Sequence, residues 1–211
     1  MRGLWLAISV LAWSGNTTLA AQIQDNSFLL EEAYNQEAGV VQHINTFALA
    51  SGNDWGYTFT QEWPLGGIRH QLSYTIPIER LSEAGTGFGD IALNYRYQLA
   101  GDPEARVVAA PRLSLLVPTG NEERGRGSGG LGFQGNIPLT LVLNRYIVTH
   151  WNAGATITPS ARNSLGNQAT ATAFNLGASA IWLLHPSLNI LVETVWSSAE
   201  SVVSEGKDAT L

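Results

Sequence analysis

The sequence predicts an all-β protein: an antiparallel up-and-down β-barrel of the type that spans a bacterial outer membrane. Three features lead to this prediction: a secretion signal, a composition poor in charge and rich in aromatic residues, and repeated strands with a period of two. Only 13% of the 211 residues are charged, compared with about 25% in ordinary soluble domains. The chain has 22 glycines and 7 tryptophans. This composition suits a surface that faces something other than water.

The first 21 residues have the organisation of a secretory signal peptide. Met1-Arg2 gives a positive start, Leu4–Trp13 is apolar, and Leu19-Ala20-Ala21 ends in small residues that suit cleavage after Ala20 or Ala21. The apolar run is too short for a transmembrane helix, which needs about 20 residues. We therefore expect a mature chain that starts near residue 22 and is exported to the outer membrane.

The clearest strand pattern is a hairpin over residues 55–76. Large side chains at Trp55, Tyr57, Phe59 and Trp63 alternate with smaller or polar ones, and a similar run follows the turn at residues 64–67. Pairing Trp63 with Ile68 places the aromatic side chains on one face. The same register places Glu62 beside Arg69 on the other face, as a barrel wall between lipid and a wet lumen requires.

The same alternation recurs along the chain and gives about nine strands. Their lengths cluster near ten residues, which is enough to cross a membrane at a tilt. Connections are short at 64–67, 100–104, 144–145 and 185–187, and longer at 77–87, 118–130 and 158–169. We expect the short connections to be periplasmic turns and the longer ones to be outer loops.

Nine is an odd number of strands, so we expect the complete barrel to have further strands after these nine. An open edge in lipid would leave backbone groups without partners. The sequence interpretation is therefore a barrel domain over residues 39–211 that is incomplete at its C-terminus. Residues 22–211 alone are expected not to close into a barrel that shows heat-dependent gel migration.

Residues 22–38 do not fit the strand pattern. Asp25-Asn26-Ser27 could cap a short helix with Phe28, Leu29, Ala33 and Tyr34 along one stripe. We expect this segment to be a periplasmic arm or a plug in the barrel.

Several segments resemble the family named for the MetA pathway of phenol degradation. The likeness covers most of the mature chain, and the segments that carry it are residues 25–37, 40–44, 61–64, 69–74, 87–91 and 118–120. The resemblance implies an outer-membrane barrel of about a dozen strands with a transporter-like role in aromatic catabolism.

The candidate functional residues are polar side chains on the inward side of the predicted strands. They line the lumen, where they either fill the interior by pairing with one another or line a path for a solute. The sequence leaves both alternatives open. The candidates are Glu62, Arg69, Gln71, Asp90, Asn94, Arg96, Arg112, Asn136, Asn175 and Glu193.

No catalytic, cofactor or metal site is predicted. The glycines at 85–90 lead into a strand rather than a helix, so the geometry of a dinucleotide loop is missing. The four histidines have no metal-ligand spacing, and cysteine is absent. A lipid-hydrolysing barrel would need a serine and a histidine on its outer wall, and the predicted register puts His70 outward and Ser73 inward.

The predicted function is passive transport of small apolar or aromatic solutes across the outer membrane, by a protein that is not an enzyme. The expected partners are outer-membrane lipid and such a solute. Nucleic acid is disfavoured because acidic residues outnumber basic ones by 17 to 11. The first alternative is a structural barrel without transport. The second, less favoured one is a lipid-hydrolysing barrel. The oligomeric state is not predicted.

Overall fold

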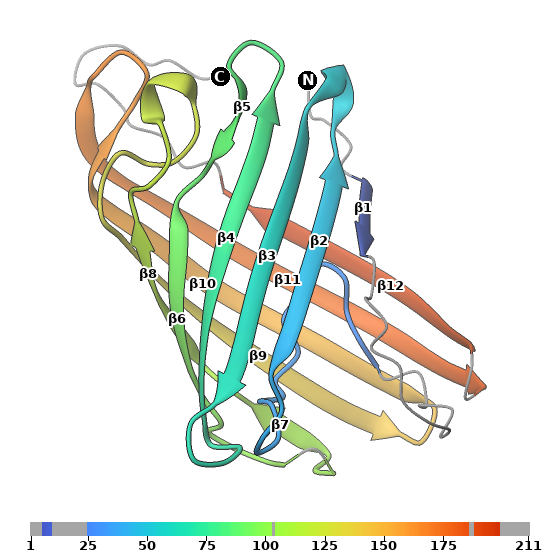
Figure 1. The fold of residues 1–211 in the computed structure, drawn as a ribbon. Coiled ribbons are helices and arrows are strands. Elements are labelled where there is room, and N and C mark those ends of the chain that lie inside the picture. The colour runs from blue at the N-terminus through green and yellow to red at the C-terminus, as the bar shows by residue number, and fades with distance from the viewer. Residues whose placement is uncertain (1–5, 10–24, 103, 186–187, 199–211) are drawn as a thin grey trace.

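A computed structural model describes residues 6–9, 25–102, 104–185 and 188–198. These residues form one antiparallel β-sheet that curls into a half-barrel (Figure 1). Strands β2 to β4 stand on one side of the curl and β9 to β12 on the other, with β6 and β8 between them. The all-β, antiparallel part of the prediction is confirmed. Most of the predicted signal peptide lies outside the described residues.

Nine strands form the wall of the half-barrel. Neighbours along the wall are neighbours in sequence once three short strands are set aside, which is the up-and-down order that hairpin connections produce. The wall strands are β2 (Gln42–Leu49), β3 (Trp55–Pro64), β4 (His70–Leu81), β6 (Ile91–Tyr97), β8 (Arg112–Val117), β9 (Gly132–Asn144), β10 (Ile147–Arg162), β11 (Gln168–His185) and β12 (Leu188–Ser197).

The three short strands extend this wall. β1 (Leu6–Ser9) pairs with the end of β2, β5 (Gly85–Phe88) folds back on β4, and β7 (Val107–Ala109) pairs with β9. β7 and β8 pair with β9 in one continuous register and are separated by residues 110–111. Pro111 has no N–H to donate to a neighbouring strand, which explains the interruption.

Two predicted outer loops are partly strand. β4 continues to Leu81 and forms a hairpin with β5, and β10 and β11 continue to Arg162 and from Gln168. The expected loops at 77–87 and 158–169 were therefore wrong in extent. The reason is that small and polar residues, which look like loop in a sequence, still pair when a long neighbouring strand supplies hydrogen bonds. β10 and β11 have 16 and 18 residues.

The register of the first hairpin also differs from the prediction. Trp63 pairs with Leu72 and Glu62 with Ser73, so β4 is displaced by four residues relative to the predicted pairing. The connection is longer than a tight turn and is closed by the Leu65 N–H donating to the His70 carbonyl at 2.7 Å. Because four is an even number, each side chain keeps its predicted face.

The two faces of the sheet have opposite character. The outward face carries exposed apolar side chains, among them Phe174, Trp182, Val192 and Trp196, which are 55%, 55%, 68% and 56% exposed. The inward face holds the buried polar side chains, including Gln71, Arg96, Thr140 and His150. Neither Trp55 nor Trp63 is buried in a core. Within the described residues, no helix has the length and apolar character needed to cross a membrane.

Candidate functional site: the N-terminal strap on the inner face

A segment without regular secondary structure crosses the inner face of the half-barrel. We call residues 25–36 the N-terminal strap. It contains no helix, so the predicted short helix is wrong. Figure 1 shows the segment in blue, passing from the side of β12 toward the lower end of β2. Its backbone has no strand partner, and side chains of the wall supply most of its hydrogen bonds.

Arg96 on β6 is the most connected of these wall residues. Its Nε donates to the Asn35 side-chain oxygen at 2.8 Å, and its two terminal nitrogens donate to the carbonyls of Glu32 at 3.3 Å and Tyr34 at 2.6 Å. The guanidinium also lies 3.7 Å from the Glu62 carboxylate. Arg96 is only 7% exposed, and these partners satisfy a charge that would otherwise be costly to bury.

Arg112 on β8 forms a second charged contact with the strap. Its Nε donates to both carboxylate oxygens of Glu31, at 2.8 and 3.0 Å. The same guanidinium donates to Asn94 at 3.0 Å and to Gln134 at 2.8 Å. Arg112 therefore joins the strap to a row of polar side chains along the wall.

Neutral amides and a hydroxyl hold the rest of the strap backbone. Asn152 accepts from the Glu31 N–H at 3.1 Å and donates to the Glu31 carbonyl at 2.8 Å. Gln98 accepts from the Asn35 N–H at 3.0 Å and donates to the Ala33 carbonyl at 2.9 Å. A side-chain amide has both an NH₂ donor and a carbonyl acceptor, so it pairs with the strap backbone as a neighbouring strand would. Thr140 and Gln71 accept from the N–H groups of Ala33 and Gln36.

The start of the strap is bound to β12 and β10. The Glu193 carboxylate accepts from the Ser27 hydroxyl and from the N–H groups of Phe28 and Leu29. The ring of His150, which is fully buried, contacts the Asp25 carbonyl through Nε2 at 2.8 Å and Thr140 through Nδ1 at 2.8 Å. The strap thus connects strands from both sides of the curl.

Two packing contacts fix the strap in position. Ala33 is fully buried against Val108 and Ala110. Leu30 lies so close to Gly177 on β11 that a Cβ at this glycine would come within 2.1 Å of the Leu30 side chain. A Cβ at this inward position would therefore force the Leu30 side chain to shift, and a larger side chain would overlap the strap.

Glu32 has an ionisation that differs from that of an ordinary carboxyl group. Burial raises the pKa of Glu32 to about 7, while the hydrogen bond from the Ser27 N–H opposes this shift. The nearby carboxylates of Asp25 and Glu62 add to the rise, and the Arg96 charge reduces it. Near neutral pH this group is divided between its two protonation states.

The ten predicted lumen residues divide by location. Five contact the strap: Glu62, Gln71, Arg96, Arg112 and Glu193. Three are hydrogen-bonded to other side chains of the wall: Asn94 to Arg112, and Asn136 and Asn175 to each other. Asp90 lies at the loop end, where its carboxylate accepts from Gly120 and Ser128.

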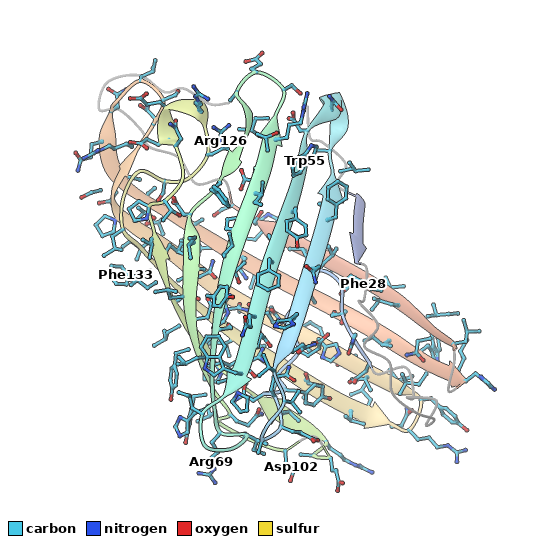
Figure 2. The ribbon with its side chains drawn as sticks, in the orientation of Figure 1. Phe28, Trp55, Arg69, Asp102, Arg126 and Phe133 are labelled. Carbon is cyan, nitrogen blue, oxygen red and sulfur yellow. The ribbon has the colours of Figure 1, made fainter. Side chains whose placement is uncertain are left out.

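Arg69 is the exception, and the predicted Glu62–Arg69 pair is wrong. Arg69 lies in the turn before β4 with an exposed side chain, and Figure 2 shows it at the lower end of the half-barrel, outside the lumen. The cause is the four-residue displacement of the hairpin, which leaves Glu62 opposite Ser73. Arg96, two strands away from Glu62, takes the place of the expected cation.

Sequence reasoning missed four residues that bind the strap: Gln98, Thr140, His150 and Asn152. Each lies at an inward position of the alternation, and each has a side chain with a hydrogen-bonding group. The alternation would have selected them if every inward side chain with a hydrogen-bonding group had been included, and not mainly the charged ones. What the alternation could not show is that their partner is a distant backbone segment.

The residues considered for catalysis or metal binding do not come together. His70 is exposed on the outward face and bonds the Tyr95 hydroxyl at 2.7 Å, whereas Ser73 faces inward and accepts from Asn94. In the part of the chain that the structure describes, no three side chains of the metal-ligating types gather. No family model matches this chain, and no curated protein matches it either.

Proposed function

We propose that this protein is an outer-membrane β-barrel that admits small solutes passively through a lumen occluded by its own N-terminal strap. The observation that carries the proposal is the contrast across the sheet. The outward face exposes apolar side chains, and the inward face binds a strap by polar groups that water can also solvate. A wall between lipid and a wet lumen has this distribution.

The outward face supports membrane insertion. Large exposed apolar patches on a protein mark contact with a membrane or another protein. Here they extend along β9 to β12 and include Ile137, Trp151, Phe174, Ile190 and Val192, each 48% to 68% exposed. The signal-like N-terminus predicted from the sequence fits export to the same membrane.

The inward face bears on the class of solute. Beside the strap the wall presents hydroxyl and amide groups, for example Thr60 with Thr75, Ser73 with Asn94, and Gln134 with Thr156. Such groups pair with solutes that carry hydroxyl groups. Phenolic solutes, which the family resemblance suggests, combine a hydroxyl group with a small ring and are the class we propose.

Removing the strap from its place tests the proposal. In Gly177→Leu the new side chain overlaps Leu30, and overpacking of this kind costs about 1–3 kcal/mol. The fraction of protein with an open lumen should then rise roughly tenfold per 1.4 kcal/mol. The full protein is reconstituted in liposomes, and arabinose-driven swelling and 4-hydroxybenzoate uptake are measured. Gly135→Ala is the matched control, because its Cβ points outward and meets only Leu113 at 3.9 Å.

The expected result is greater flux for Gly177→Leu and unchanged flux for Gly135→Ala. Protease accessibility of the strap and heat-dependent gel migration show whether each variant is folded with its strap released. A folded Gly177→Leu protein with a released strap and no greater flux than the parent would contradict transport.

A structural barrel is the second candidate, and the strap itself favours it. The strap joins β4, β6, β8, β9, β10 and β12 across the interior, which would stiffen a barrel without opening a path. The flux measurement above separates the two candidates. A lipid-hydrolysing activity is tested by labelling with a fluorophosphonate probe, and we expect no serine to react.

A further inference from the structure

An apolar groove interrupts the outward face where β3, β4, β6, β8 and β9 lie side by side. Its volume is about 540 Å³, within the range of about 300–1,000 Å³ that is typical of small-molecule sites. The groove lies on the opposite side of the wall from the strap and takes no part in the lumen.

Strand register explains how the groove forms. One row of outward side chains runs Trp63, Leu72, Tyr95, Leu113 across the neighbouring strands, and the next row contains Tyr74, Leu93, Leu115 and Phe133. The first row continues onto β9 at Gly135, which pairs with Leu113 and has no side chain. The second row continues with the large ring of Phe133. The groove is lined by these two rows of large apolar residues.

Polar groups lie at the end of the groove toward the β3–β4 turn. The Tyr95 hydroxyl contacts His70 Nδ1 at 2.7 Å, and the exposed His70 ring lies against Tyr95 and Tyr97. Arg69 precedes His70 in the exposed turn. An occupant that matches both parts would have a long apolar chain and an acidic or hydrogen-bonding head.

We propose that this outer groove binds one acyl chain of a membrane amphiphile, with the head near His70 and Arg69. The proposal rests on the membrane location proposed above. The chemistry of the lining selects the acyl chain. The side chains of the two rows are aliphatic or aromatic, the Tyr74 hydroxyl is bonded to Gln61 at 2.9 Å, and the imidazole of His70 lies at one end. The remainder of the outward wall would contact lipid without holding a particular molecule.

Tryptophan quenching by brominated fatty acid tests the proposal. Two single-tryptophan proteins are made by changing the other tryptophans of the mature chain to Phe. One keeps Trp63, which lines the groove, and the other keeps Trp182, which is exposed on β11. Both are reconstituted in dioleoylphosphatidylcholine vesicles and titrated with 9,10-dibromostearate.

For a groove with one acyl chain, quenching of Trp63 should saturate at about one fatty acid per protein and be reversed by added oleate. Quenching of Trp182 should instead rise in proportion to the dibromostearate in the bilayer. Leu93→Phe in the Trp63 protein fills the middle of the groove and should abolish the saturable phase while leaving the proportional one.

The other outcomes overturn one proposal or the other. If both tryptophans show only proportional quenching, the groove holds no particular chain and the membrane location stands. If neither is quenched, the membrane location fails. If Trp182 is quenched and Trp63 is not, the groove is covered by protein. In that case Leu113→Cys, the sole cysteine of such a variant, should give a disulfide-linked dimer.

Discussion

Two regions of the half-barrel, the strap across its inner face and a pair of loops at its upper end, are held in place by different chemistry. The strap is held by side chains of the wall that bond it at many points along six strands, and five of these strands bond its backbone. The loops at the upper end comprise residues 82–90 and 118–130, and we call them the loop clasp. The clasp is held mainly by two of its own charged residues, Asp90 and Arg126. Figure 2 shows Arg126 at that upper end.

The clasp concentrates its bonds. The Asp90 carboxylate accepts from the Gly120 N–H at 3.0 Å, the Ser128 N–H at 2.7 Å and the Ser128 hydroxyl at 2.8 Å. Arg126, 4% exposed, donates to the carbonyls of Ala84 and Gly85. The strap should therefore detach in steps, whereas the clasp should open as one unit when a single charge is removed. Three substitutions, given in order of decreasing effect, and a change of pH test this difference.

Arg96→Ala should have the largest effect. It removes three hydrogen bonds to the strap and leaves the Glu62 carboxylate without its cation, and breaking such a buried pair costs about 3–5 kcal/mol. We expect hydrogen exchange at the strap amides of Ala33, Asn35 and Gln36 to accelerate strongly. Arg69→Ala, in the exposed turn, should leave exchange unchanged. Equal effects of the two substitutions would contradict the assigned role of Arg96.

Asp90→Ala should open the clasp and leave the strap bound. The Gly120 N–H, the Ser128 N–H and the Ser128 hydroxyl lose the carboxylate that accepts from them. A hydrogen bond to a charged group is worth about 1.5–3 kcal/mol. Exchange should accelerate at the amides of Gly120 and Ser128 and stay slow at Asn35. If the strap amides accelerate as well, the two regions form one cooperative unit and the comparison fails.

Glu193→Gln should loosen only the first residues of the strap. The amide keeps one oxygen acceptor but loses the charge, at a cost of about 1 kcal/mol. We expect faster exchange at Phe28 and Leu29 and no change at Asn35 and Gln36. Release of the whole strap would show that it detaches as one unit rather than in steps.

The fourth prediction concerns pH, which should act on the strap through Glu32. Its pKa is about 7 in the bound strap and about 4.5 when exposed, so the bound state holds more protons between these values. The contribution of Glu32 to binding of the strap is therefore largest below about pH 4.5 and falls as the pH rises toward 7. Protease accessibility of the strap measured across this range should show the trend, and Glu32→Gln should remove the contribution of this group.

The nine wall strands and the faces of their side chains follow from the sequence pattern, whereas the full lengths of β4, β10 and β11 do not. A side chain in a strand alternates strictly between two faces, so the pattern of large apolar and small polar residues fixed which side chains point inward. For this reason the aromatic residues of β3 and the polar residues of β6 and β9 lie on the predicted sides, even though the first hairpin is displaced by four residues.

The residues that pair across the strands and that bind the strap depend on the three-dimensional arrangement of the sheet. Alternation specifies a face but not a register beyond odd or even, so it could not distinguish Glu62 beside Arg69 from Glu62 beside Ser73. The strap has no regular alternation of side chains. Its backbone is bonded to Arg96, Gln98 and Asn152, which are 60 or more residues away in sequence. Such bonds are set by the curvature of the sheet, which brings both sides of the wall around one segment, and no local pattern encodes that curvature.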